Sequence, residues 1–174
     1  MKILVAGGVA AGTKVAAKLK RENRDAEITV FNKGKNISYA GCGLPYYVGN
    51  VIEDKAELIV NTPQKYQKLT GVNVLTEREV TSVNRAEKSI CVKDLTTGEE
   101  SVETYDKLVI ATGASPVKPP VPGVDLENVF FMRTPEDAIT LRDTIDAGEI
   151  KRAVVVGGGY IGLEVAENLQ AKGI

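Results

Sequence analysis

The 174-residue chain contains no histidine and only two cysteines, Cys42 and Cys91. Zinc sites are built mainly from cysteine and histidine at close spacing, and this chain offers neither the residues nor the spacing. Small disulfide scaffolds need more cysteines than two, so the composition also argues against that class. So few cysteines are typical of a protein from a reducing compartment.

Charge of one sign and long apolar runs are also missing. The chain has 22 basic and 23 acidic residues with no basic run, and its few aromatic residues do not alternate with arginines as a base-stacking surface requires. We therefore expect no nucleic-acid partner. The apolar opening MKILVAGGVAAG is interrupted by a glycine-rich turn and by Lys14 and Lys18 before it reaches transmembrane length. We expect no membrane segment and a cytoplasmic location.

The chain begins with the pattern of a strand, a glycine-rich turn and a helix. Residues 2–6 and 27–31 predict strands, and residues 7–12 (GGVAAG) predict the turn before the helix. In a dinucleotide-binding βαβ unit, such a turn brings backbone N–H groups to a pyrophosphate at the positive end of the helix dipole. Val9 replaces the middle glycine, so a plain tight turn is the alternative. Asn32 stands where an acidic residue usually binds the ribose, and an amide can still hydrogen-bond a hydroxyl.

A second glycine-rich motif strengthens the nucleotide interpretation. Residues 153–156 predict a strand, and residues 157–162 (GGGYIG) form a full G-x-G-x-x-G that leads into a helical stretch at 163–173. Two dinucleotide motifs in one chain are far stronger evidence than one.

The segment between the two motifs carries further strands. Residues 107–116 (KLVIATGASP) predict a buried strand that ends at Thr112 and Gly113, where small residues allow backbone to lie against a cofactor. An ordinary strand followed by a linker is the alternative. Three short alternating segments predict an antiparallel β-meander, at residues 79–84, 89–94 and 101–105.

Cys42 lies in the stretch SYAGCGLPYY, residues 38–47, between two glycines. Flanking glycines leave the sulfur approachable, which favours chemistry over packing. Pro45 is of a type favoured in the first turn of a helix, so Cys42 is expected near a positive helix end, which favours the thiolate. An inert cysteine beside a turn is the alternative.

Five motifs occur in an order that resembles the N-terminal part of the FAD-dependent pyridine nucleotide-disulfide oxidoreductases. They are GGVAAG, SYAGCGLPYYVG, NTPQKY, YDKLVIATGASP and GGGYIGLEVAE. The resemblance implies an α/β fold: a Rossmann-like, three-layer FAD-binding domain with an antiparallel β-meander insertion, followed by the start of a second Rossmann-like domain. On this basis residues 1–148 belong to the FAD-binding domain, and residues 149–174 are the first strand and helix of the NAD(P)-binding domain.

The resemblance also implies which residues hold the two cofactors. The FAD candidates are Gly7, Gly8, Ala11, Gly12, Asn32, Lys33, Thr112 and Gly113. The candidates for NADH or NADPH are Gly157, Gly159 and Gly162. The side chain that chooses between NADH and NADPH is expected beyond Ile174.

The family is divided by its redox cysteines. Relatives of glutathione reductase have a second cysteine five positions after the first, and here that position is Tyr47. Cys91, in the middle of a predicted strand, is interpreted as a packed core thiol. The chain therefore resembles the single-cysteine branch, which contains coenzyme A-disulfide reductases, persulfide reductases, and NADH oxidases and peroxidases. In the oxidases and peroxidases the first turn carries a histidine, at the position of Ala10, so the resemblance favours coenzyme A-disulfide reductase, although Gly41 stands where that group commonly has asparagine.

A basic stripe on the first helix bears on the substrate. Lys14, Lys18 and Arg21 recur at i, i+4 and i+7 and so share one face. The resemblance implies that Lys18 and Arg21 bind coenzyme A phosphates, and a solvated surface is the alternative. Ser38 and Tyr39 are further substrate candidates. Three tyrosines are equally compatible with packing or with the wall of a substrate channel: Tyr39, Tyr46 and Tyr47.

The implied activity is a relay from NAD(P)H through FAD to Cys42, and on to coenzyme A disulfide or a related disulfide or persulfide. The resemblance further implies later segments that complete both domains and a homodimeric parent enzyme. The 174 residues are therefore expected to be an incomplete fragment, inactive by itself. NADH oxidase activity, or a catalytically incompetent flavin-binding fragment, are the alternatives.

Overall fold

The computed structural model describes residues 1–148 and 150–174 in two compact units. The first unit comprises Met1–Tyr39 and Ile59–Ala114, and the second comprises Ala40–Leu58 and Ser115–Ile174. The predicted domain boundary falls at Glu149, which lies outside the described residues, so that boundary stays a prediction. Among the described residues, no helix combines the length and the apolar character needed to cross a membrane.

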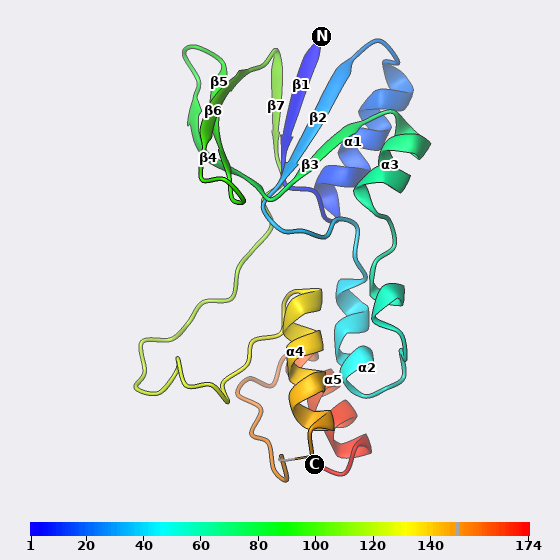
Figure 1. Ribbon diagram of the computed structural model, residues 1–174, viewed down its shortest axis with the longest axis vertical. Helices are drawn as coiled ribbons and strands as arrows, with labels where there is room; N and C mark the ends of the chain where they lie inside the picture. Colours follow the sequence, from blue (N-terminus) through cyan, green and yellow to red (C-terminus); the bar gives the residue numbers. More distant parts are fainter. Residues whose placement is uncertain (149) are drawn as a thin grey trace. The chain divides into compact units, whose positions relative to one another are not determined.

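A four-stranded parallel sheet forms the centre of the first unit, in the order β3-β2-β1-β7 (Figure 1). The strands predicted from the first βαβ unit and from the KLVI segment are present, with β2 one residue longer than expected. The prediction of a buried strand at KLVI is wrong, because β7 lies at the edge of the sheet and its residues are half-buried or exposed. The bounds are Lys2–Ala6 for β1, Glu27–Asn32 for β2, Asn73–Thr76 for β3 and Lys107–Ile110 for β7.

Alternation along the central strands divides the core into two layers. On one face, Ile3 and Val5 of β1 pack with Ile28 and Val30 of β2 in the cluster that also takes in Ala16 of helix α1. That face is covered by α1 (Ala11–Glu22) and α3 (Pro63–Thr70) (Figure 1). Successive strand residues point to opposite sides, so the alternate residues are left for a third layer.

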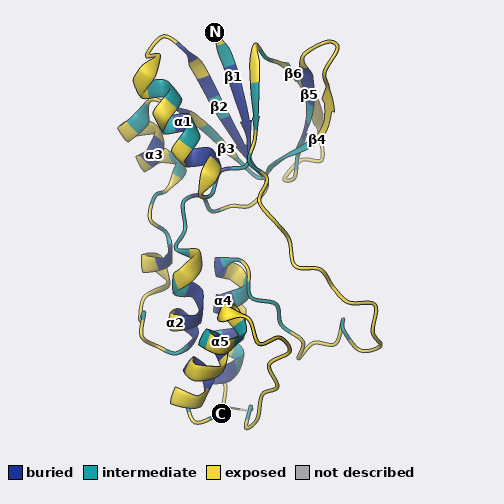
Figure 2. Ribbon diagram, turned by 180° about the vertical axis from the view of Figure 1, so that it is seen from behind, coloured by how far each residue is buried: buried dark blue, intermediate teal, exposed yellow. Residues whose placement is uncertain are grey.

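The third layer is the predicted antiparallel meander. It has the order β4-β5-β6, and Ile90 and Val92 of β5 are buried against Leu4 and Phe31 of the central sheet. Its bounds are Arg78–Asn84 for β4, Ser89–Asp94 for β5 and Glu100–Thr104 for β6. The three-layer arrangement and the meander are therefore confirmed, and Figure 2 shows buried residues along β1, β2 and β5.

The interpretation of Cys91 as a packed core thiol is only partly right. Its side chain is half-buried, and its sulfur lies 3.7 Å from a carboxylate oxygen of Glu100 on the neighbouring strand. Strand alternation explains the difference, because Ile90 and Val92 take the two core positions on either side of it.

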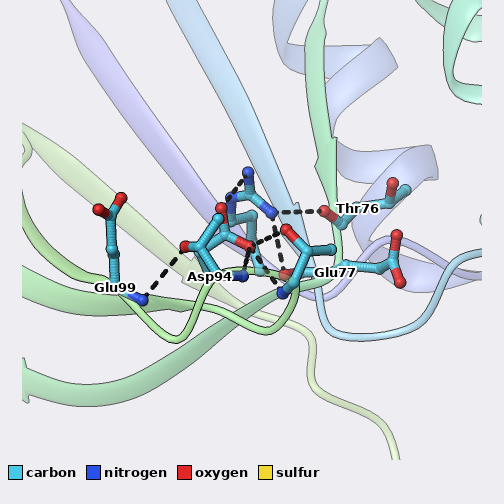
Figure 3. A network of polar contacts seen from close by, with 7 residues as sticks. Thr76, Glu77, Asp94 and Glu99 are labelled. Atoms are coloured by element: carbon cyan, nitrogen blue, oxygen red, sulfur yellow. Dashed lines mark hydrogen bonds and ion pairs between the residues drawn. The ribbon is translucent and has the colours of Figure 1, made fainter.

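An arginine network joins the central sheet to the meander where β3 passes into β4. The guanidinium of Arg78 donates to the carbonyls of Thr76 and Glu77 and pairs with Asp94 at 2.6 Å. Figure 3 shows this group, in which Asp94 also donates its N–H to the carbonyl of Glu99. The network closes the corner at Glu77, which has a positive φ of 56°.

The second unit is helical. Its helices are α2 (Leu44–Val48), α4 (Pro135–Asp146) and α5 (Tyr160–Ala171), and two short 3₁₀ turns precede and follow α2, at Gly41–Gly43 and Lys55–Leu58. Arg142 of α4 holds the end of α2 by donating to the carbonyls of Tyr47, Ile52 and Glu53. Its guanidinium also stacks on the ring of Tyr47, 4.3 Å from the ring centre.

The strand predicted at residues 153–156 is not present. These residues have no regular secondary structure, and Val154 and Val156 are 89% and 95% exposed. A strand requires a neighbouring strand to pair its N–H and C=O groups, and no described strand pairs with this segment. The helix after it does form, beginning three residues earlier than predicted.

Candidate functional site

The first glycine-rich turn brings two of the predicted cofactor segments together. Gly7 has a φ of 105°, and a Cβ at this position would overlap the carbonyl oxygen of Ala111. The same added Cβ would lie 3.1 Å from the backbone nitrogen of Thr112. Only glycine allows the turn after β1 to approach the end of β7 this closely. The turn around Gly7 and the turn at Thr112 and Gly113 therefore form one continuous backbone surface.

Gly12 closes the same turn from the helix side. It is buried in the first turn of α1, and a Cβ there would overlap the carbonyl oxygen of Gly7 and lie 3.3 Å from a methyl carbon of Val5. Ala11, the first residue of α1, is exposed. The helix therefore starts directly on the glycine turn, with its first N–H groups at the surface of that turn.

The second glycine motif repeats this construction in the other unit. Gly157 has a φ of 116°, and a Cβ on Gly162 would overlap the carbonyl oxygen of Gly157 and lie 3.4 Å from a methyl carbon of Val155. Gly159 is the N-cap of α5, and neither Gly158 nor Gly159 has a neighbour that an added Cβ would meet. The turn geometry is present even though the strand before it is not.

Helix capping distinguishes the two glycine-turn helices from α3 and α4, while the five-residue α2 also lacks a side-chain cap. Helices α3 and α4 are capped by Thr62 and Thr134, whose hydroxyls accept backbone N–H groups, and Asp137 completes a capping box in α4. Helices α1 and α5 have no side-chain cap and no acidic residue in the first turn. Uncapped N–H groups without nearby negative charge suit a phosphate. The residues present therefore fit a dinucleotide at each turn.

Asn32 is the last residue of β2, and Lys33 follows it. Asn32 is 5% exposed, and its side chain bonds to Gly8, Gly34 and Asn36. Lys33 is exposed and its ammonium pairs with the carboxylate of Glu79 at 2.8 Å. Asn32 thus contacts the glycine turn through Gly8, and the side chains of both residues already have protein partners.

The basic stripe of α1 is divided by its neighbours. Lys14 and Arg21 line an open hollow of about 320 Å³ together with Ser38 and Tyr39, and Tyr66 of α3 contributes to its wall. Lys18 instead pairs with Glu22 at 2.6 Å, and both side chains are about 60% exposed. The structure therefore groups Arg21 with the substrate candidates Ser38 and Tyr39. It also places Lys14 in this hollow, a residue of the predicted basic stripe that was not predicted to bind substrate.

A second hollow of about 320 Å³ shares Arg21 with the first. Lys20 and Arg24 add two further basic side chains, and Leu69 and Thr70 of α3 form the opposite wall. Two adjoining hollows with four basic residues, Lys14, Lys20, Arg21 and Arg24, favour an elongated anionic ligand along α1.

Cys42 lies in the 3₁₀ turn Gly41–Gly43 and is exposed. Gly41 has open space where a Cβ would be, whereas a Cβ on Gly43 would lie 2.9 Å from Ile52. Pro45 is in the first turn of α2, as predicted. Gly41 thus leaves space beside the exposed sulfur, and four of the five residues of the helix that follows are buried.

The three tyrosines left open by the sequence have different environments. Tyr47 is 5% exposed beneath Arg142, so it packs, whereas Tyr46 is partly exposed and Tyr39 lines the first hollow. Sequence reasoning missed Arg142, because its three carbonyl partners lie 89 to 95 positions away in the chain. It could have found the Lys18–Glu22 pair from the i, i+4 spacing.

Comparison with known proteins identifies the family. The sequence profile described as "Pyridine nucleotide-disulphide oxidoreductase" matches residues 1–174. The chain is 37% identical over 173 residues to a coenzyme A disulfide reductase of Staphylococcus haemolyticus, covering 99% of this chain and 39% of the relative. It is 38% identical over 167 residues to an NADH oxidase of Enterococcus faecalis, covering 96% of this chain and 37% of the relative.

Solved structures agree. The crystal structure of reduced Bacillus anthracis CoADR-RHD superimposes with a TM-score of 0.96 at 40% identity, covering 99% of this chain and 31% of that one. An NAD-dependent persulfide reductase from A. fulgidus gives a TM-score of 0.95 at 39% identity, covering 100% and 33%. The chain spans less than half the length of these relatives. With the two glycine turns and the matched sequence, the chain belongs to the pyridine nucleotide-disulphide oxidoreductase family.

Proposed function

We propose that the protein containing this chain is an NAD(P)H-dependent flavoprotein that reduces small disulfides or persulfides at Cys42. The observation that carries the proposal is the exposure of Cys42. The residue five positions after it, Tyr47, is buried beneath Arg142. No second cysteine stands there to form an internal disulfide, so the sulfur must exchange with a disulfide from solution. Similarity to a coenzyme A disulfide reductase and a persulfide reductase supports this class of substrate.

The cofactor residues of the proposal fall into the two glycine turns. FAD would be held in the first unit by Gly7, Gly8, Ala11, Gly12, Lys33, Thr112 and Gly113, with Asn32 bonded to Gly8 beside the turn. NADH or NADPH would be held at the second turn by Gly157, Gly159 and Gly162. When bound, FAD supplies the capacity to accept hydride from the nicotinamide and to pass two electrons to a disulfide.

Cys42 supplies the covalent step. Its thiolate attacks one sulfur of a substrate RSSR, the S–S bond breaks, RS⁻ leaves, and a mixed disulfide forms between Cys42 and R–S. Two electrons and a proton, derived from NAD(P)H, return Cys42 to the thiolate and release RSH, and the RS⁻ released first takes a proton from solvent. The sum is RSSR + NAD(P)H + H⁺ → 2 RSH + NAD(P)⁺. The exposure of Cys42 permits this attack without movement of a covering side chain.

Coenzyme A disulfide is the substrate that fits the first unit best. Coenzyme A is long and carries several phosphates, and the two adjoining hollows along α1 present Lys14, Lys20, Arg21 and Arg24. Ser38 and Tyr39 complete the first hollow. Lys18 stays a secondary candidate, because Glu22 competes with a phosphate for its ammonium. A homodimeric, cytoplasmic enzyme is part of the same proposal.

The proposal is tested in the intact protein with coenzyme A disulfide, glutathione disulfide, polysulfide and oxygen as acceptors. We expect a preference for coenzyme A disulfide, and we expect Cys42→Ser to lower its reduction more than about a hundredfold, because the attacking sulfur is lost. Cys91→Ser is the matched control and should keep the activity. Preference for oxygen, with Cys42→Ser retaining the rate, would favour the oxidase activity named for the Enterococcus relative and overturn the proposal.

A further inference from the structure

The carboxamide of Asn32 uses all of its donors inside the protein. Its nitrogen donates to the carbonyl of Gly34 at 2.8 Å and to the carbonyl of Asn36 at 3.0 Å, and its oxygen accepts the N–H of Gly8 at 3.0 Å. A primary amide has only two N–H donors. The orientation of the group is fixed by its partners, since an N–H faces the oxygen and two carbonyls face the nitrogen. No side-chain N–H of Asn32 therefore remains for a nucleotide hydroxyl.

These bonds join the glycine turn to the loop after β2. Gly8 donates to Asn32, and its carbonyl accepts the N–H of Ser38 at 3.3 Å, so both backbone groups of Gly8 are held by this segment. A Cβ on Gly8 would lie 3.0 Å from the Cβ of Asn32, which shows how closely the two residues pack. Gly8 thus has its position set by residues 32 and 38.

The same loop leads to the substrate hollow. Ser38 has a φ of 49°, a conformation that few residues other than glycine adopt without support, and its carbonyl accepts the N–H of Val60 at 3.0 Å. Ser38 and Tyr39 then line the hollow beside α1. Residues 33–38, which Asn32 holds by hydrogen bonds, therefore connect the residue that contacts the glycine turn to the residues that line the hollow.

We propose that Asn32 is a positioning residue that holds the glycine turn and the 33–38 loop in the geometry that binds FAD, and that it does not donate to the ribose itself. This rests on the proposal that the first glycine turn holds FAD. An acidic residue usually binds the ribose at this position. Its carboxylate could accept the N–H of Gly8, but it would have no hydrogen to donate to the carbonyls of Gly34 and Asn36. Asn32→Asp separates the two roles because it changes only the donor half of the group.

The first measurement is amide hydrogen exchange in the protein without FAD. We expect Asn32→Asp at pH 7 to speed exchange in residues 34–38 by about tenfold or more, because both donated bonds are lost. The difference from wild type should shrink on acidification, since a protonated carboxyl can again donate one bond. Asn73→Asp, the same change at an exposed residue of β3, is the matched control and should exchange like the wild type at each pH.

The second measurement is calorimetric titration of the same proteins with FAD. We expect Asn32→Asp to bind FAD about tenfold more weakly at pH 7 and to recover in part at lower pH. Wild-type exchange together with tighter FAD binding would show a direct ribose bond and overturn the proposal, as would faster exchange with unchanged FAD affinity. If neither wild type nor Asn73→Asp binds FAD, the cofactor assignment fails, while the exchange data still decide whether Asn32 holds the loop.

Discussion

Gly162 packs against the carbonyl oxygen of Gly157 in the way that Gly12 packs against that of Gly7. In each pair the second glycine lies five positions after the first, and the first has a φ above 100°. Two segments about 150 residues apart have therefore acquired the same backbone turn. The contact leaves no room for a side chain at Gly12 or Gly162. Each turn can therefore be tested by a glycine-to-alanine substitution, which adds one methyl group.

Gly162→Ala should destabilise the start of α5, because its methyl group would overlap a backbone carbonyl that cannot move without breaking the turn. We expect a loss of about 1 to 3 kcal/mol in the free energy of unfolding and a marked weakening of NADH or NADPH binding in the intact protein. Gly158→Ala is the matched control, since its Cβ would enter open space at a permitted φ. Chemical denaturation of both variants provides the measurement, and equal midpoints would contradict the assignment.

Local sequence patterns predicted most of the first unit. Strand β1, the start of β2 and the whole of β5 were placed at their observed bounds, because alternation and flanking turn residues act over a few positions. The strand at 153–156 was wrong, because a strand depends on a neighbour that no local pattern encodes. The sequence pattern therefore located the glycine turn before α5, but it did not predict that residues 153–156 lack regular secondary structure.

The sequence predicted those parts of the candidate site whose geometry depends on the backbone alone. It predicted less well the residues whose roles depend on hydrogen-bond partners. Gly7 and Gly12 followed from the motif, since their role depends on having no side chain. The roles of Asn32 and Arg142 depend on partners elsewhere in the chain, such as Gly8, which lies 24 positions before Asn32. Hydrogen-bond partners at such separations leave no periodic trace in a single sequence.

Arg142→Ala should loosen the helix that follows Cys42. The three carbonyls of Tyr47, Ile52 and Glu53 lose their common donor, so we expect about 2 kcal/mol less stability and faster amide exchange in residues 44–53. Arg142→Lys should recover only part of this loss, since one ammonium cannot reproduce the planar stack on Tyr47.

Arg152→Ala, at an exposed arginine of the same unit, is the control for the loss of charge. Exchange of residues 44–53 that is equal in Arg142→Ala and Arg152→Ala would show that the clamp contributes nothing to holding α2.

Tyr66 should give the unfolding free energy a dependence on alkaline pH. Burial raises the pKa of its hydroxyl, which donates to the carbonyl of Thr13. A raised pKa in the folded state means that the stabilisation is fully present below the unfolded pKa and is lost as pH rises through the folded value. We therefore expect wild type to lose stability relative to Tyr66→Phe as pH rises above about 10.

Below that range Tyr66→Phe should be less stable than wild type by about 1 kcal/mol, the usual contribution of a hydrogen bond. Denaturant titrations at pH 7 and at several alkaline values give the comparison. Tyr160→Phe, at a tyrosine that is 88% exposed, controls for the loss of a hydroxyl. A constant difference between wild type and Tyr66→Phe across the alkaline range would contradict the predicted linkage.

Arg21 and Lys18 should contribute unequally to substrate binding, although both belong to the basic stripe of α1. Arg21 lines both hollows, whereas Lys18 is paired with Glu22. We expect Arg21→Ala in the intact protein to raise KM for coenzyme A disulfide about tenfold with little change in kcat, because a charge-assisted phosphate contact is lost from the bound substrate. Lys18→Ala is the matched control and should change KM less than about twofold, as exposed ion pairs contribute little.

Two comparisons separate a phosphate contact from an indirect effect of Arg21→Ala. A disulfide without phosphates should be reduced equally well by wild type and variant, and the KM difference for coenzyme A disulfide should shrink as salt is raised, because exposed charges are screened. If Arg21→Ala raised KM equally for both disulfides at every salt concentration, Arg21 would be acting through the fold of α1. If Lys18→Ala had the larger effect, the Lys18–Glu22 pair would have to open on binding, and the substrate would follow the original stripe of Lys14, Lys18 and Arg21.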